Sequence, residues 1–74
     1  MYKNRNEQIL LQENIKNIFQ SHPDFMEQKI DLQFVKLINS MIMDNKPSTL
    51  IELSKEIRAV KIDIMEGWRT YAFQ

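Results

Sequence analysis

Apolar residues recur at helical spacing in three segments of this sequence, and the two prolines fall at the breaks between them. Residues three and four apart share one side of a helix, so this spacing predicts helices rather than strands. We expect helices at about residues 4–20, 23–44 and 49–72. The single glycine and the abundance of Leu, Ile, Met, Glu, Gln and Lys also favour helix throughout.

The residues at the two breaks are typical helix starts. Ser21 precedes Pro23 in the sequence SHPD, which predicts an N-cap at Ser21 followed by a proline in the first turn. Thr49 and Glu52 have the spacing of a capping box, in which each side chain can accept a hydrogen bond from the other residue's backbone N–H.

The first and third segments each have one apolar stripe, which predicts packing against a neighbour along one side. In the first segment the stripe is Leu11, Ile15, Ile18 and Phe19. In the third segment it is Leu50, Leu53, Ile57, Val60, Ile64, Trp68 and Tyr71.

The second segment is apolar over most of its circumference, which is typical of a helix buried on two sides. The other two helices cannot easily cover both sides, so we expect a second copy of the chain or a partner protein to cover one of them, with a homodimer as the first expectation. The residues expected at this dimer interface are Val35, Ile38 and Ile42. The prediction is an all-α, three-helix protein that forms an intertwined or bundled helical homodimer.

The 74 residues form at most one domain, 1–74, with a core too small for high stability on its own. Without cysteine there are no disulfides or thiolate metal sites, and the one histidine, His22, has no partners for a metal or catalytic site. We therefore expect no catalytic residues, no metal, no cofactor and no enzyme activity. No apolar signal or membrane-spanning run is present, so we expect a cytoplasmic protein without membrane contact.

Charged residues, which sum to a net charge of zero, separate onto different sides of the third helix. One side carries four carboxylates within about 80° of arc, Glu52, Glu56, Asp63 and Glu66. The second segment adds Asp24, Glu27 and Asp31, again at helical spacing. A further side carries the basic residues Lys55, Arg58, Lys61 and Arg69. Each group can be an ordinary solvated face of a helix. Alternatively, the carboxylates can imitate the phosphates of DNA, or the basic residues can bind the phosphates of DNA.

A short stretch, KIDLQF at 29–34, resembles the peptide by which bacterial polymerases dock on the replicative sliding clamp. Ile30, Leu32 and Phe34 match its apolar positions and Asp31 its polar one, whereas Lys29 replaces a glutamine. Core packing is the competing interpretation of these side chains, because Ile30 and Phe34 belong to the main apolar side of the segment.

The whole chain is similar in style to small, cysteine-free early proteins with which bacteriophages of Gram-positive hosts disable host machinery. Among these are staphylococcal-phage inhibitors of the sliding clamp. The resemblance implies a host-takeover protein in the host cytoplasm that binds the clamp (the beta subunit of DNA polymerase III) and inhibits DNA replication as a DNA mimic. The acidic rows suit the clamp's DNA channel, and Ile30, Leu32 and Phe34 suit its peptide-docking pocket. The alternatives are a helical DNA-binding transcriptional regulator and a scaffold subunit.

Overall fold

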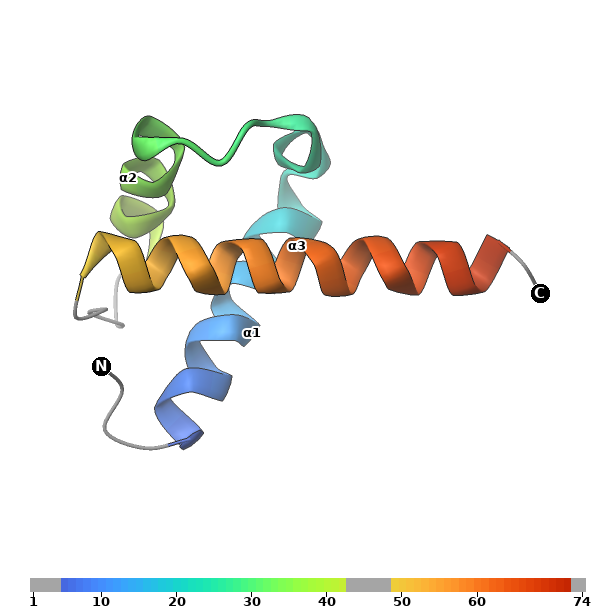
Figure 1. The fold of residues 1–74 in the computed structure, drawn as a ribbon, viewed down its shortest axis with the longest axis horizontal. Helices are drawn as coiled ribbons and strands as arrows, with labels where there is room; N and C mark the ends of the chain where they lie inside the picture. The colour runs from blue at the N-terminus through green and yellow to red at the C-terminus, as the bar shows by residue number, and fades with distance from the viewer. Residues whose placement is uncertain (1–4, 43–48, 73–74) are drawn as a thin grey trace.

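The computed structural model describes the backbone of residues 5–42 and 49–72, and the side chains of 5–42 and 49–67. The described residues form the α-helices α1 (Arg5–Ser21), α2 (Leu32–Met41) and α3 (Leu50–Ala72), and one 3₁₀ helix, η1 (Pro23–Glu27). No strand occurs among them, which confirms the expected all-α class. Figure 1 shows α3 crossing α1, with α2 near the first turns of α3.

Helix α1 has nearly the predicted bounds and ends where the next proline requires it to end. Helical backbone is disfavoured for the residue before a proline, and His22 is accordingly non-helical, with φ −130° and ψ 76°. The prediction that Ser21 caps the next helix is wrong. Ser21 is the last residue of α1, and the N-cap of η1 is His22, whose side chain makes no capping hydrogen bond.

The main difference from the sequence prediction lies in segment 23–44, which is not one helix. The 3₁₀ helix η1 ends at Glu27, and Gln28 is extended, with φ −75° and ψ 142°. Asp31 is also extended and caps α2, because one of its carboxylate oxygens accepts a hydrogen bond from the backbone N–H of Phe34 at 2.9 Å. An aspartate that satisfies a helix start in this way favours a new helix over a continuous one. The predicted end at 44 lies outside the described residues.

This break lets one chain bury apolar residues from both sides of the segment. Phe34, Val35, Ile38 and Ile42 lie in the core, and three residues before the break, Phe25, Met26 and Ile30, pack half-buried against it. One chain therefore covers most of the apolar residues of this segment, whereas Leu32 and Leu37 stay 59% and 45% exposed. The all-round apolar pattern predicted a dimer only if 23–44 formed one straight helix, and the break removes that premise.

The core joins all three α-helices. It consists of Leu11, Ile15 and Phe19 from α1, Phe34, Val35, Ile38 and Ile42 from α2 and its C-cap, and Leu53, Ile57 and Val60 from α3. Aromatic rings close one end, since Phe34 meets Phe25 edge-on at 5.6 Å between ring centroids and Phe19 at 6.3 Å. Both predicted stripes are confirmed as far as Ile64, and the side chains of Trp68 and Tyr71 lie outside the described ones.

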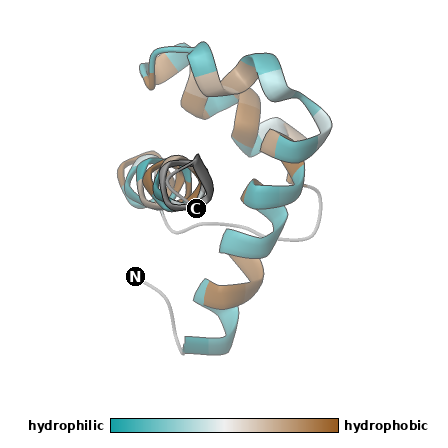
Figure 2. Cartoon of the chain, turned by 90° about the vertical axis from the view of Figure 1, so that its right-hand side faces the viewer, coloured by the Kyte–Doolittle hydropathy of each residue, from teal (hydrophilic) through white to brown (hydrophobic). Residues whose placement is uncertain are grey.

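Helix α3 begins as predicted and extends beyond the other helices. The hydroxyl of Thr49 accepts a hydrogen bond from the backbone N–H of Glu52 at 3.0 Å, which confirms Thr49 as the N-cap. Figure 1 shows the C-terminal part of α3 projecting past α1 and α2. Figure 2 views α3 nearly end-on and shows the other helices covering only part of its circumference. Part of the surface of α3 is therefore accessible to a partner.

Candidate protein-binding face

The four carboxylates predicted to form one row on α3 do not share one environment. Asp63 and Glu66 are exposed, and Glu52 is half-buried near the start of the helix. Glu56 is only 8% exposed and lies where α1 crosses α3. The exposed acidic surface of α3 therefore consists mainly of Asp63 and Glu66, one turn apart.

The buried carboxylate of Glu56 is held by two glutamines of α1. The side-chain amide of Gln8 donates a hydrogen bond to one oxygen at 3.0 Å, and that of Gln12 donates to the other at 2.6 Å. A buried carboxylate is tolerated when hydrogen-bonded, so these amides explain its position. The expectation that Glu56 faces a partner is corrected by this burial. The signal for the contact was the spacing of Gln8 and Gln12, four residues apart beside the α1 stripe.

Replacing Glu56 with alanine is expected to destabilise the protein by about 1–3 kcal/mol, because the amides of Gln8 and Gln12 then lose their acceptor in a poorly hydrated place. Asp63→Ala is the matched control, since it removes an exposed carboxylate from the same helix and should change stability by no more than about 0.5 kcal/mol. Urea unfolding followed by circular dichroism measures both. Equal losses in the two variants would show that the glutamine contacts contribute nothing.

A groove of about 370 Å³ runs between α1 and α3 beside the exposed acidic residues. Its lining residues are Ile9, Gln12, Glu13, Lys16, Ala59, Val60 and Asp63. Asp63 from α3 and Glu13 from α1, both exposed, therefore line the same groove, and Glu66 lies one turn further along α3. Glu13 could not be predicted from the sequence, because only the crossing of α1 and α3 brings it into the same groove as Asp63. We call Glu13, Asp63 and Glu66 the acidic face.

The second predicted acidic group is divided by the break in the chain. Asp24 and Glu27 are exposed on η1, whereas Asp31 caps α2. The prediction that all three lie along one side of a single helix is wrong, because residues 28–31 are not helical. Asp31 has a structural role in the start of α2.

The KIDLQF stretch is also mainly structural. Its first half, Lys29–Asp31, is not helical, and α2 begins with Leu32. Phe34 is buried and Ile30 packs half-buried against the core, so neither is presented for docking, whereas Leu32 is 59% exposed. The segment is tied to α3 by Lys61, whose ammonium group donates to the carbonyl oxygen of Gln28 at 3.0 Å.

The residues predicted for a dimer interface are inside the core of one chain. Val35, Ile38 and Ile42 are buried against α1 and α3 without any second chain. Because these three side chains are buried within one chain, they are not accessible to a second copy. An interface between two copies of this fold would be formed by other residues. The homodimer itself stays a prediction.

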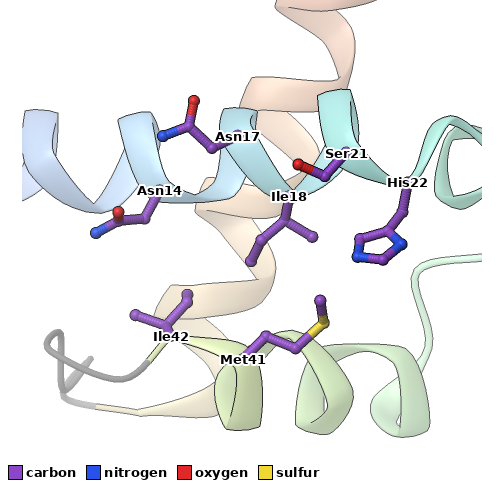
Figure 3. A pocket seen from close by; sticks show the side chains of 7 residues that line it. All are labelled: Asn14, Asn17, Ile18, Ser21, His22, Met41 and Ile42. Carbon is purple, nitrogen blue, oxygen red and sulfur yellow. The ribbon is translucent and has the colours of Figure 1, made fainter.

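A second depression lies between the end of α1 and the end of α2. Its volume is about 350 Å³, and it is lined by Asn14, Asn17, Ile18, Ser21, His22, Met41 and Ile42. Figure 3 shows Ile18 and His22 pointing toward α2, with Met41 opposite them. The imidazole of His22 stacks on Phe25, with 4.8 Å between ring centroids. No three His, Cys, Asp or Glu side chains of the described residues lie close enough together to hold a metal ion.

The basic residues of α3 are likewise not equivalent. Lys55 and Arg58 are exposed, and Lys61 is half-buried and bound to Gln28. The side chain of Arg69 lies outside the described ones. The described basic surface of α3 is therefore centred on Lys55 and Arg58.

Comparison with known proteins found no match to the chain among protein-family models, curated proteins or solved structures. Within the described part of the chain, none of the helices combines the length and apolar character needed to cross a bilayer.

Proposed function

We propose that this chain is a bacteriophage inhibitor of host DNA replication that binds the bacterial sliding clamp and blocks its DNA channel. The observation that carries the proposal is the acidic face, in which Glu13 of α1 and Asp63 of α3 line one groove and Glu66 lies one turn beyond it. The groove also contains the exposed Lys16, so its three neighbouring carboxylates outnumber one cation. It is supported by the similarity of the chain in size and composition to small phage proteins of this kind.

The inhibitor needs no chemistry, because a protein that fills the channel excludes DNA sterically and by charge. Asp63 and Glu66 are separated by about 4.5 Å along the helix axis, about a third more than the roughly 3.4 Å axial spacing of phosphates on a DNA strand. A rigid helix therefore presents its carboxylates at a spacing of the same order as that of DNA phosphates. A symmetric homodimer would present this face twice.

Channel binding is favoured over occupation of the clamp's peptide-docking pocket. Of the three apolar residues that match the docking peptide, Ile30 and Phe34 are packed in or against the core and only Leu32 is largely exposed. Using the whole stretch as a docking peptide would require the Phe34 side chain to leave its contacts with Phe19 and Phe25. Docking by this peptide would therefore destabilise the core, whereas binding through the exposed acidic face leaves the core intact.

A purified bacterial sliding clamp is expected to bind the immobilised chain at low salt and to be released at moderate salt, because exposed charges attract each other less as ionic strength rises. A pull-down from bacterial lysate at both salt concentrations, analysed by mass spectrometry, shows whether the clamp is selected among other proteins. No clamp binding at low salt would overturn the proposal.

The alternative function, a DNA-binding regulator, depends on the exposed pair Lys55 and Arg58. Duplex DNA added to the same immobilised chain distinguishes the two functions. Salt-sensitive binding of DNA without binding of the clamp would favour the regulator, since neutralising phosphates releases counterions.

A further inference from the structure

Helix α3 carries a second stripe, on the side that faces away from the core. It consists of Ile51, Lys55, Arg58, Ile62 and Met65, at spacings of 4, 3, 4 and 3 residues, and the register continues to Arg69. The three apolar members are 70%, 49% and 52% exposed, in chain order, and the two basic residues are exposed as well. We call these five residues the outer stripe. It falls within about 80° of the helix circumference.

The first turns of the outer stripe open onto a groove between α2 and α3. This groove, of about 330 Å³, is lined by Ile30, Asp31, Leu32, Val35, Leu50, Ile51, Ser54, Lys55 and Arg58. Leu32 and Ile51 are both more than half exposed there, so α2 widens the apolar end of the stripe. Exposed apolar side chains grouped beside Lys and Arg are typical of a protein-binding surface.

We propose that the outer stripe binds an amphipathic helix of another protein whose contact side is apolar at both ends and acidic in the middle. The order of residues on the stripe carries this proposal: Ile51 lies at one end, Lys55 and Arg58 in the middle, and Ile62 and Met65 at the other end. The stripe spans about 21 Å at 1.5 Å per residue, which corresponds to about four helical turns of the partner. Carboxylates in the partner's middle turns would pair with the two cations.

The charge of the stripe distinguishes this partner from two others. An antiparallel pairing of the stripe with a second copy, centred on Arg58, would place Arg58 against Arg58, and like charges in direct opposition are unfavourable. DNA would meet only the two basic residues and leave Leu32, Ile51 and Met65 without apolar contact. A partner with carboxylates between apolar residues satisfies both parts of the surface.

The two kinds of side chain have different effects on binding. Burial of the apolar residues supplies most of the affinity, because the gain is proportional to the apolar area removed from water. The cations select the partner, since exposed ion pairs add little affinity but discriminate against the wrong charge. This surface goes beyond the proposed function, because it shares no residue with the acidic face.

The test uses two labelled synthetic helical peptides of about four turns, both with leucines toward each end of one side. One peptide has glutamates in the middle turns and the other has lysines at the same positions. Binding to the full-length protein is measured by fluorescence anisotropy. The protein variant is Lys55→Glu with Arg58→Glu, both at exposed positions, and circular dichroism checks that it is folded.

The wild-type protein is expected to bind the glutamate peptide about tenfold more tightly than the lysine peptide, and the variant is expected to reverse this order. Ile62→Ser with Met65→Ser should weaken binding of both peptides, because these residues supply apolar contact. Equal binding of the two peptides to the wild type would overturn the proposal. Duplex DNA that binds better than either peptide, or a dimer in light scattering that the charge-reversal variant dissociates, would assign the stripe to nucleic acid or to a second copy instead.

Discussion

Reversing two charges on the acidic face, Asp63→Lys with Glu66→Lys, is expected to weaken binding to the sliding clamp by about 100-fold or more, equivalent to about 2.7 kcal/mol. Both carboxylates are exposed on α3, and each would become a cation facing a basic channel. The loss thus combines a missing attraction with a new repulsion. Surface plasmon resonance at low salt with purified clamp measures the change.

The control for this prediction is Asp24→Lys with Glu27→Lys. It changes the net charge by the same amount, but at η1 rather than on the acidic face. Neither pair is buried, so both variants should remain folded. If the η1 variant loses as much affinity as the α3 variant, the effect comes from total charge, and the acidic face is not the contact. If the Asp63→Lys with Glu66→Lys variant binds the clamp as tightly as the wild type, the acidic face is not the contact surface.

Ile57→Ala is expected to leave the protein largely unfolded at 37 °C. Ile57 is fully buried between the helices, and removing a buried isoleucine side chain costs about 2–5 kcal/mol through lost burial and a cavity. A core of this size rarely supplies more than about 3–5 kcal/mol in total. The substitution therefore removes most of the available stability, which thermal unfolding followed by circular dichroism would show.

Ile62→Ala is the matched control, because it makes the same substitution on the same helix at an exposed position. Its effect on the free energy of unfolding should stay within about 0.5 kcal/mol. A similar loss of stability in both variants would mean that Ile62 is also buried in solution, for example against a second chain. Native-like unfolding of Ile57→Ala would contradict the core described here.

Features set by local sequence could be predicted, and features set by contacts between distant residues could not. The stripe Leu11, Ile15 and Phe19 and the cap at Thr49 follow from spacing along one helix, and the structure confirms both. The burial of Glu56 depends on α1 crossing α3, so its own helix gave no sign of it. The proximity of Asp63 to Glu13 also depends on this crossing of α1 and α3.

The break at residues 28–31 was missed for a different reason. The sequence there contains good helix formers and no glycine or proline, so local preference permits a continuous helix. A bent chain is favoured because it brings Phe25 into contact with Phe34 at the core, whereas a straight helix would place these two residues, nine apart, on opposite sides. Asp31 marks the break, but aspartate is common enough inside helices that it does not identify an N-cap by itself.

The bend at 28–31 also determines how folding depends on the amount of protein present. A helix buried between two chains would fold only as the chains meet, so its stability would rise with protein concentration. Here most apolar residues of 25–42 lie in or against the core of one chain, whereas Leu32 and Leu37 stay exposed. The stability of this core is therefore expected to depend little on protein concentration, which thermal unfolding at two protein concentrations would measure.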